Sequence, residues 1–141
     1  MSTPLTSERK TAFHLGQVFT KALRELYKAF DGDLTMALVL GELGQYATGS
    51  LYDSSQNRRS PKIRCSNAYS ISVASGVPRE TVRRKLDKLI ARGWVIETPD
   101  GKLGLNLEHD PSLAILFSDY NRRMLQAMRE SLERLDEIEK P

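Results

Sequence analysis

The sequence is poor in the residues that most often carry catalysis or bind metals. It has one cysteine and two histidines among 141 residues, and neither His14 nor His109 has a companion at the spacing of a metal site. There is no glycine-rich phosphate-binding loop, and Asp53 and Glu108 form no recognisable pair with another carboxylate. We therefore expect no enzyme activity, no metal and no cofactor.

The scarcity of cysteine and of long apolar runs also bears on location. A lone Cys65 excludes an internal disulfide and fits a reducing compartment. The basic neighbours Lys62 and Arg64 can lower the pKa of a thiol, so a redox sensor stays open beside the simpler interpretation of an incidental cysteine. No apolar run approaches the roughly 18 residues of a membrane span, and the first ten residues lack the apolar stretch of a signal peptide. We expect a cytoplasmic protein without membrane association.

The charge that is present is segregated along the chain. Residues 58–93 contain ten basic and two acidic side chains, a balance of +8, whereas the whole chain has a net charge of +3. The remainder therefore carries −5. Segregation of this kind predicts one surface that faces a polyanion and a body that balances it.

The basic segment contains the pattern around which the chain is organised. Residues 71–95 read as a short helix, a turn at Gly76 and a longer helix over 78–92, with Pro78 in its first turn. Apolar residues recur at helical spacing and predict one buried stripe: Val82, Leu86, Leu89 and Ile90. The charged residues between them fall on the other side, as in a helix-turn-helix that presents side chains to a DNA major groove.

A β-hairpin is predicted directly after this helix. Residues 94–97 and 102–107 alternate as strands, and Thr98-Pro99-Asp100-Gly101 joins them with strong turn chemistry. A hairpin in this position is the wing of a winged helix, here over 94–107.

The remaining segments complete the predicted fold. Helices are expected over 7–30, 34–47 and 111–139, the last capped by Asp110, with a flexible basic loop at 48–66 and the helix-turn-helix plus wing at 67–107. The predicted class is mainly α with a small β-hairpin, in one winged-helix domain over 1–141 that has flanking dimerisation helices at both ends. The first helix contains four aromatic residues, Phe13, Phe19, Tyr27 and Phe30. Two interpretations of them stay open: they pack in the core, or they line a pocket for an unknown small-molecule effector.

The last helix is too long for so small a domain to cover, since nearly 30 residues span roughly 45 Å. Its apolar stripe is therefore expected to pair with a second copy of the chain, together with the first helix. The predicted dimerisation residues are Leu113, Phe117, Tyr120, Met124, Met128, Leu132 and Leu135.

The stretch from Gly76 to Arg84, followed by Leu86, Leu89 and Gly93-Trp94, resembles the helix-turn-helix of bacterial winged-helix regulators. Its Arg-Glu-Thr-Val-x-Arg is similar to the recognition helix of the cyclic-AMP receptor protein family. That likeness implies base contacts by Arg79, Glu80 and Arg84 and a backbone contact by Thr81. The nucleotide-binding barrel of that family has no counterpart here, so its ligand is not implied. The layout of the whole chain is similar to the MarR family, which implies a dimer formed by the terminal helices.

The expected function is sequence-specific binding of double-stranded DNA by a homodimeric transcriptional regulator. Arginine pairs with guanine and glutamate accepts from cytosine, so the predicted base-contacting residues are Arg79, Glu80, Arg83 and Arg84. The predicted phosphate-contacting residues are Ser75, Thr81, Lys85, Lys88, Lys102, Arg58 and Arg59. Two alternatives stay open: the arginines form salt bridges with Glu80 or Asp87, or the basic face binds an acidic protein in an assembly module.

Overall fold

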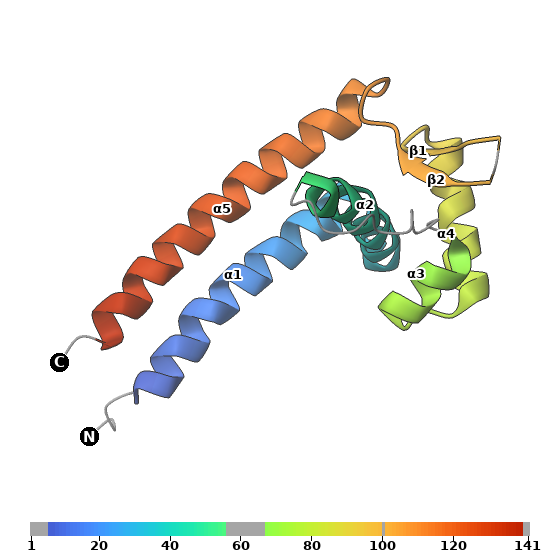
Figure 1. Ribbon diagram of the computed structural model, residues 1–141. Coiled ribbons are helices and arrows are strands. Elements are labelled where there is room, and N and C mark those ends of the chain that lie inside the picture. Colours follow the sequence, from blue (N-terminus) through green and yellow to red (C-terminus); the bar gives the residue numbers. More distant parts are fainter. Residues whose placement is uncertain (1–5, 56–66, 100, 140–141) are drawn as a thin grey trace. The chain divides into compact units, whose positions relative to one another are not determined.

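A computed structural model describes residues 6–55, 67–99 and 101–139. These residues form five helices and one antiparallel pair of strands (Figure 1): α1 (Ser7–Ala29), α2 (Leu34–Ser55), α3 (Ala68–Ser75), α4 (Arg79–Ala91), β1 (Val95–Glu97), β2 (Leu103–Leu105) and α5 (Pro111–Glu139). The predicted class is confirmed in its coarse form, mainly helical with a small hairpin.

The chain divides into two compact units, where the sequence predicted a single domain. Residues Asp33–Ala114 form a central unit, and Met1–Gly32 with Ile115–Pro141 form a terminal unit. The predicted dimerisation helices, 7–30 and 111–139, therefore make up most of the terminal unit. Each unit is described by itself.

The core of the central unit is built from α2, α3, α4 and the hairpin. Its fully buried side chains come from all of these elements and from the first turn of α5: Val39, Leu40, Leu43, Ile71, Val82, Leu89, Val95 and Leu113. Burying each leucine or isoleucine contributes about 1.5–3 kcal/mol. Gly44 allows close approach to the hairpin, since a Cβ at that position would lie 3.4 Å from Leu105 Cδ1.

Helix α2 is longer than predicted. The sequence predicted a helix over 34–47 and a loop over 48–66, but residues 48–55 are helical, so the loop prediction is wrong for that part. Glycine and serine lower helix stability by up to about 1 kcal/mol each without forbidding it, and extending an existing helix costs far less than starting one. The rest of the predicted loop, with Arg58 and Arg59, lies outside the described residues.

The turn between α3 and α4 is held by local hydrogen bonds. A capping box begins α3, in which Asn67 Oδ1 accepts from the Ser70 amide at 2.8 Å and Ser70 Oγ accepts from the Asn67 amide at 3.0 Å. Gly76 follows α3 with φ +77°, as predicted. Ser72 Oγ then donates to the Val77 carbonyl at 2.6 Å. The direction in which α4 leaves the turn is therefore fixed by the sequence of the turn itself.

Helix α4 begins at Arg79, with Pro78 as its N-cap and without a side-chain cap, one residue later than the predicted start at 78. It ends at Ala91 with Arg92 as its C-cap, one residue before the predicted end at 92, and Gly93 follows with φ +86°. The Gly93 amide donates to the Ile90 carbonyl and the Trp94 amide to the Leu89 carbonyl, both at 3.0 Å. This pair of bonds is a Schellman motif, and it turns the chain directly into β1.

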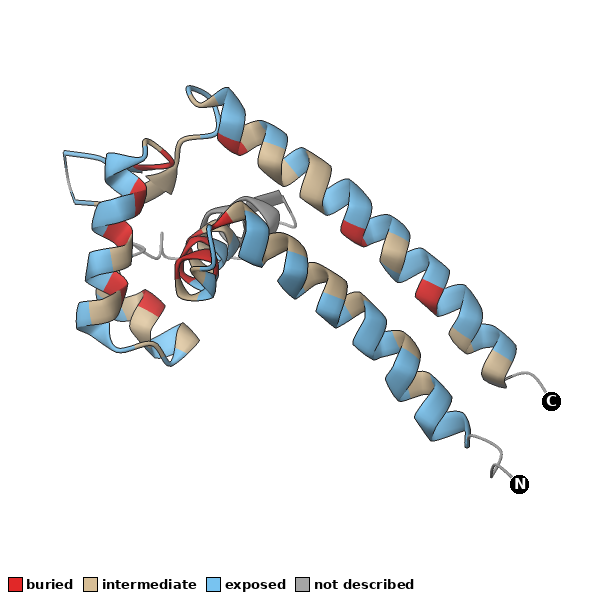
Figure 2. Cartoon of the chain, turned by 180° about the vertical axis from the view of Figure 1, so that it is seen from behind, coloured by how far each residue is buried: buried red, intermediate tan, exposed pale blue. Residues whose placement is uncertain are grey.

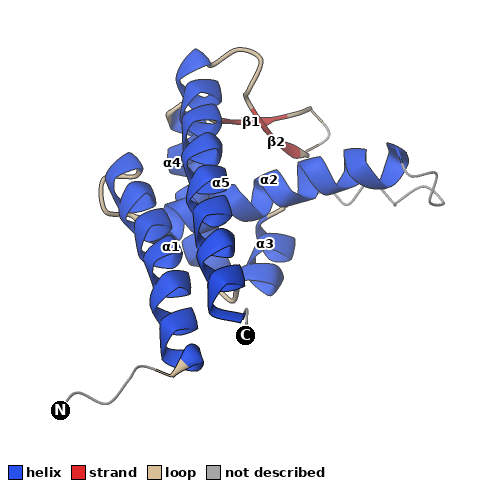
Figure 3. Cartoon of the chain, turned by 90° about the vertical axis from the view of Figure 1, so that its left-hand side faces the viewer, coloured by secondary structure: helices blue, strands red, loops and turns tan. Residues whose placement is uncertain are grey.

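The terminal unit consists of two long antiparallel helices. Helix α1 and residues 115–139 of α5 run side by side in the views of Figures 1 and 3. Thr6 caps α1 by accepting from the Arg9 amide at 3.3 Å. Asp110 caps α5 by accepting from the amides of Ser112 at 2.9 Å and Leu113 at 3.4 Å, as predicted. The Ser112 hydroxyl, which donates to the same carboxylate, is the main cause of the lowered pKa of Asp110.

Candidate functional site

Helix α4 separates its apolar and cationic residues onto different sides. Val82, Leu86 and Leu89 are buried, while Arg83, Arg84 and Lys88 are exposed, and Figure 2 shows the alternation of buried and exposed positions along this helix. Ile90, predicted for the buried stripe, is exposed because it lies at the edge of that stripe. The central unit therefore presents a cationic helix face beside its hairpin.

Two of the predicted base-contacting residues are paired with each other. Arg83 donates from Nη2 to Glu80 Oε1 at 2.6 Å and from Nε to Oε2 at 3.2 Å. This pairing lowers the pKa of Glu80 and raises the pKa of Arg83. Both side chains are more than 60% exposed, and an ion pair in that setting is weak enough to exchange for another partner. The salt-bridge alternative is thus realised for Arg83 in the isolated chain.

Arg79 has a different neighbour. Its guanidinium carbon lies 5.9 Å from the ring centroid of Tyr69, which belongs to the first turn of α3. The distance falls within the range of a cation–π contact. Sequence reasoning missed Tyr69, because nothing in its local pattern indicates that the turn brings it to the start of α4.

Lys85 and Ser75, two predicted phosphate-contacting residues, make hydrogen bonds within the central unit. Lys85 Nζ donates to Asp33 Oδ2 at 2.7 Å, and both side chains are mostly covered. Partial burial alone would raise the pKa of Asp33, but the hydrogen bonds from Lys85 and the Met36 amide lower it overall. Ser75 Oγ donates to the Ile71 carbonyl and accepts from the Val77 amide. A phosphate would have to compete with these bonds, so both contacts stay predictions.

The other predicted phosphate-contacting residues are spread around α4 and the hairpin. Lys88 is exposed and Thr81 half-buried on α4. Lys102 is half-buried and follows the hairpin turn, where its amide donates to Thr98 Oγ1 at 3.2 Å. Arg58 and Arg59 lie outside the described residues.

The hairpin is fastened to the end of α4. Strands β1 and β2 pair in the register Val95↔Leu105, and Asn106 Nδ2 donates to the Gly93 carbonyl at 2.8 Å. The guanidinium carbon of Arg92 lies 3.9 Å from the centroid of the Trp94 ring, and Trp94 Nε1 donates to Ser112 Oγ at 3.3 Å. The position of the hairpin beside α4 is therefore set by several independent contacts.

In the terminal unit, α5 carries two apolar seams. The inner seam consists of Phe117, Tyr120, Met124 and Ala127, which are buried or half-buried, and it continues to the buried polar residue Ser131. It faces α1, since Arg123 Nε donates to Glu25 Oε2 at 2.9 Å and the charge of Glu25 adds to the effect of burial in raising the pKa of Tyr120. The outer seam consists of Leu125, Met128 and Leu132, which are 49%, 51% and 58% exposed.

Helix α1 also leaves an apolar seam uncovered. None of its residues, all of which the structure describes, is buried. Leu15, Phe19, Leu23 and Tyr27 recur every four residues and are all exposed, Phe19 by 68%. Core packing therefore accounts for Phe30 among the four aromatic residues of this segment, while Phe13, Phe19 and Tyr27 are exposed.

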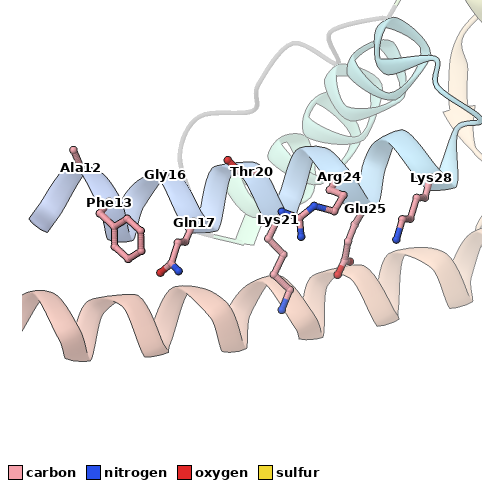
Figure 4. A pocket seen from close by; sticks show the side chains of 9 residues that line it. All are labelled: Ala12, Phe13, Gly16, Gln17, Thr20, Lys21, Arg24, Glu25 and Lys28. Atoms are coloured by element: carbon pink, nitrogen blue, oxygen red, sulfur yellow. The ribbon is translucent and has the colours of Figure 1, made fainter. Parts of the chain in front are cut away.

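A groove of about 760 Å³ runs along another side of α1. Figure 4 shows its lining side chains, of which Phe13, Gln17 and Glu25 point toward α5. Three cations, Lys21, Arg24 and Lys28, also line it. Its size suits a small molecule, so an effector remains an open prediction.

Within the described ranges, no group of histidine, cysteine and carboxylate side chains has the arrangement of a metal site. None of the helices there is long and apolar enough to cross a membrane.

Comparisons with known proteins add no relative: no protein-family model, no curated protein and no solved structure matches this chain.

Proposed function

We propose that the chain is a sequence-specific, double-stranded DNA-binding transcriptional regulator that acts as a homodimer with a winged-helix layout. In this proposal α4 enters the major groove and the hairpin contacts the backbone or the minor groove. The observation that carries it is the exposed cationic face of α4, with Arg79, Arg83, Arg84 and Lys88, beside a hairpin that is fastened to the end of the same helix.

The chemistry of that face suits DNA. Guanidinium groups pair with the O6 and N7 acceptors of guanine, and a carboxylate accepts from N4 of cytosine. Glu80 and Arg83 exchange their mutual ion pair for base edges, which is inexpensive because the pair is exposed. Thr81 lies in the first turn of α4, and Lys88 lies about one turn after Arg84. We assign both to phosphates, which line the edges of the groove.

The second copy is supported by the two uncovered seams. A helix with one apolar seam needs one neighbour, whereas α1 and α5 each carry an additional exposed seam. The exposed side chains Phe19, Met128 and Leu132 are an unfavourable surface in water and a suitable one for an identical chain. A two-fold dimer would place two α4 helices about 34 Å apart on a roughly palindromic site.

Selection of bound duplexes from a random pool, followed by a salt titration, tests DNA binding. Several phosphate contacts predict a log–log slope of about −0.9 per contact. Replacing Arg79 and Arg84 by alanine should abolish the selected preference. The matched control, Arg129→Ala with Arg134→Ala, removes the same charge from exposed positions on α5 and should preserve that preference.

The same experiment separates DNA from an acidic protein partner. A protein that uses its basic face on another protein would show no selected sequence. Duplex binding that was unchanged by the double substitution at Arg79 and Arg84 would contradict the proposed regulator.

A further inference from the structure

Tyr69 is a large aromatic side chain that the core does not use. It lies in the first turn of α3 and is 59% exposed. Its described neighbour is the guanidinium of Arg79, 5.9 Å from the ring centroid. The ring of Tyr69 therefore lies outside the core and beside the first residue of α4.

The geometry between these two residues is held by the turn that separates them. The capping box of Asn67 and Ser70 fixes the start of α3. Gly76 adopts the left-handed conformation, and Ser72 Oγ bonds to the Val77 carbonyl. The backbone carrying Tyr69 and Arg79 is thus restrained on both sides of the turn.

Arg79 differs from Arg83 in what holds it. Arg83 donates two N–H groups to Glu80, and the Glu80 carboxylate also neutralises the charge of Arg83 locally. An aromatic face attracts a guanidinium through its π-electrons and leaves the N–H donors at the edge of the plane available. Arg79 is therefore restrained while it keeps both its charge and its donors for a new partner.

We propose that Tyr69 is a positioning residue that orients Arg79 for bidentate pairing with guanine. This inference rests on the proposed DNA-binding function and names a specificity determinant within it. A side chain held in advance loses less conformational freedom on binding. Arg79 is then the base-reading residue oriented before contact, whereas Arg83 must first leave Glu80.

The test uses the full-length chain and three variants at one position. Tyr69→Phe keeps the ring, and Tyr69→Leu and Tyr69→Ala remove it. An exposed cation–π contact corresponds to about a two- to fivefold change in an equilibrium constant. Because each protomer of the dimer contributes one such contact, Tyr69→Leu should lower the affinity for the operator by about four- to twenty-five-fold. It should also relax the base preference at one base pair in each half-site.

Tyr69→Phe should retain wild-type affinity and preference, because the ring is preserved. Thermal melting controls for folding, and little change is expected because Tyr69 is exposed. In the Arg79→Ala background, Tyr69→Leu should have no further effect, since the residue acts through Arg79.

Three results would overturn the inference. If Tyr69→Leu bound the selected duplex like the wild type, the positioning role would be wrong while the proposed function stood. If Tyr69→Leu weakened binding equally in the Arg79→Ala background, Tyr69 would contact DNA itself. If the wild-type chain selected no duplex at all, the proposed function would fail and this inference with it.

Discussion

Replacing Phe19 by alanine should weaken self-association without unfolding the chain. Phe19 is 68% exposed at the centre of the uncovered seam of α1. Fully burying such a side chain contributes about 1.5–3 kcal/mol, so covering its exposed two-thirds contributes about 1–2 kcal/mol in each protomer. Two copies give about 2–4 kcal/mol, which raises the dimer dissociation constant by roughly 30- to 1,000-fold.

Sedimentation equilibrium over a range of concentrations measures this change. Alanine is the best helix former, so the substitution does not weaken α1 itself. Val73→Ala is the matched control, because Val73 is 69% exposed but lies on α3 in the central unit, and its dimer should dissociate like the wild type. A Phe19→Ala chain that dimerised with wild-type affinity would refute the role given to this seam, and a wild-type chain that stayed monomeric at all concentrations would refute the dimer.

Three further predictions concern stability and can be checked by thermal or denaturant unfolding. Asp33→Asn should cost about 1 kcal/mol near neutral pH, because it removes the negative charge that pairs with Lys85, whereas an asparagine oxygen can still accept from the Met36 amide at the start of α2. The pKa of Asp33 is lowered below 3.8 in the folded chain, so its contribution is present above that value and disappears as the pH falls through the folded pKa. The variant should therefore lose less stability on acidification, and equal acid sensitivity would contradict this. Gly76→Ala should cost about 1–2 kcal/mol although no atom lies within 4 Å of the added Cβ, since φ is +77° there; an unchanged midpoint would show that the turn relaxes. Met124→Ala should lower the free energy of unfolding by about 2 kcal/mol or more, because Met124 is buried, whereas Met128→Ala should be nearly neutral in the monomer. A larger loss of stability for Met128→Ala than for Met124→Ala would contradict the assignment of the two residues to the outer and inner seams.

The features that were predictable from the sequence are those with local causes. The cap at Asp110, the left-handed turn at Gly76 and the left-handed turn at Gly93 that follows α4 each depend on residues within five positions. The hairpin follows from alternating residues around a Pro-Asp-Gly turn. These local signals were sufficient to locate the helices and the hairpin. The end of α2 was not predicted, because its last eight residues have weak helix propensity and are helical only as a continuation of the helix that precedes them.

Contacts between elements were not predictable from local patterns. The Lys85–Asp33 pair joins residues 52 positions apart, so it depends on how α4 lies against α2. Lys85 was consequently predicted to contact phosphate, since its position on α4 is otherwise like that of Lys88. Tyr69 and Arg79 are closer in sequence, but their approach depends on the angle set at Gly76.

The predicted dimerisation stripe of α5 shows how a helical period can combine residues from two different surfaces of one helix. Its first member, Leu113, is fully buried in the core of the central unit, so its predicted place on a dimer surface is wrong. Phe117, Tyr120 and Met124 follow spacings of three and four and lie on the inner seam. Two successive steps of four then lead to Met128 and Leu132 on the outer seam, and the last member, Leu135, is half-buried. Because a turn has 3.6 residues, each step of four rotates the position by about 40°, and two such steps move it across the helix face. The predicted stripe therefore joined two surfaces, one that packs within the terminal unit and one that is exposed. Leu125, Met128 and Leu132 remain exposed in the described chain, and the proposed dimer would give α5 its second neighbour at this outer seam.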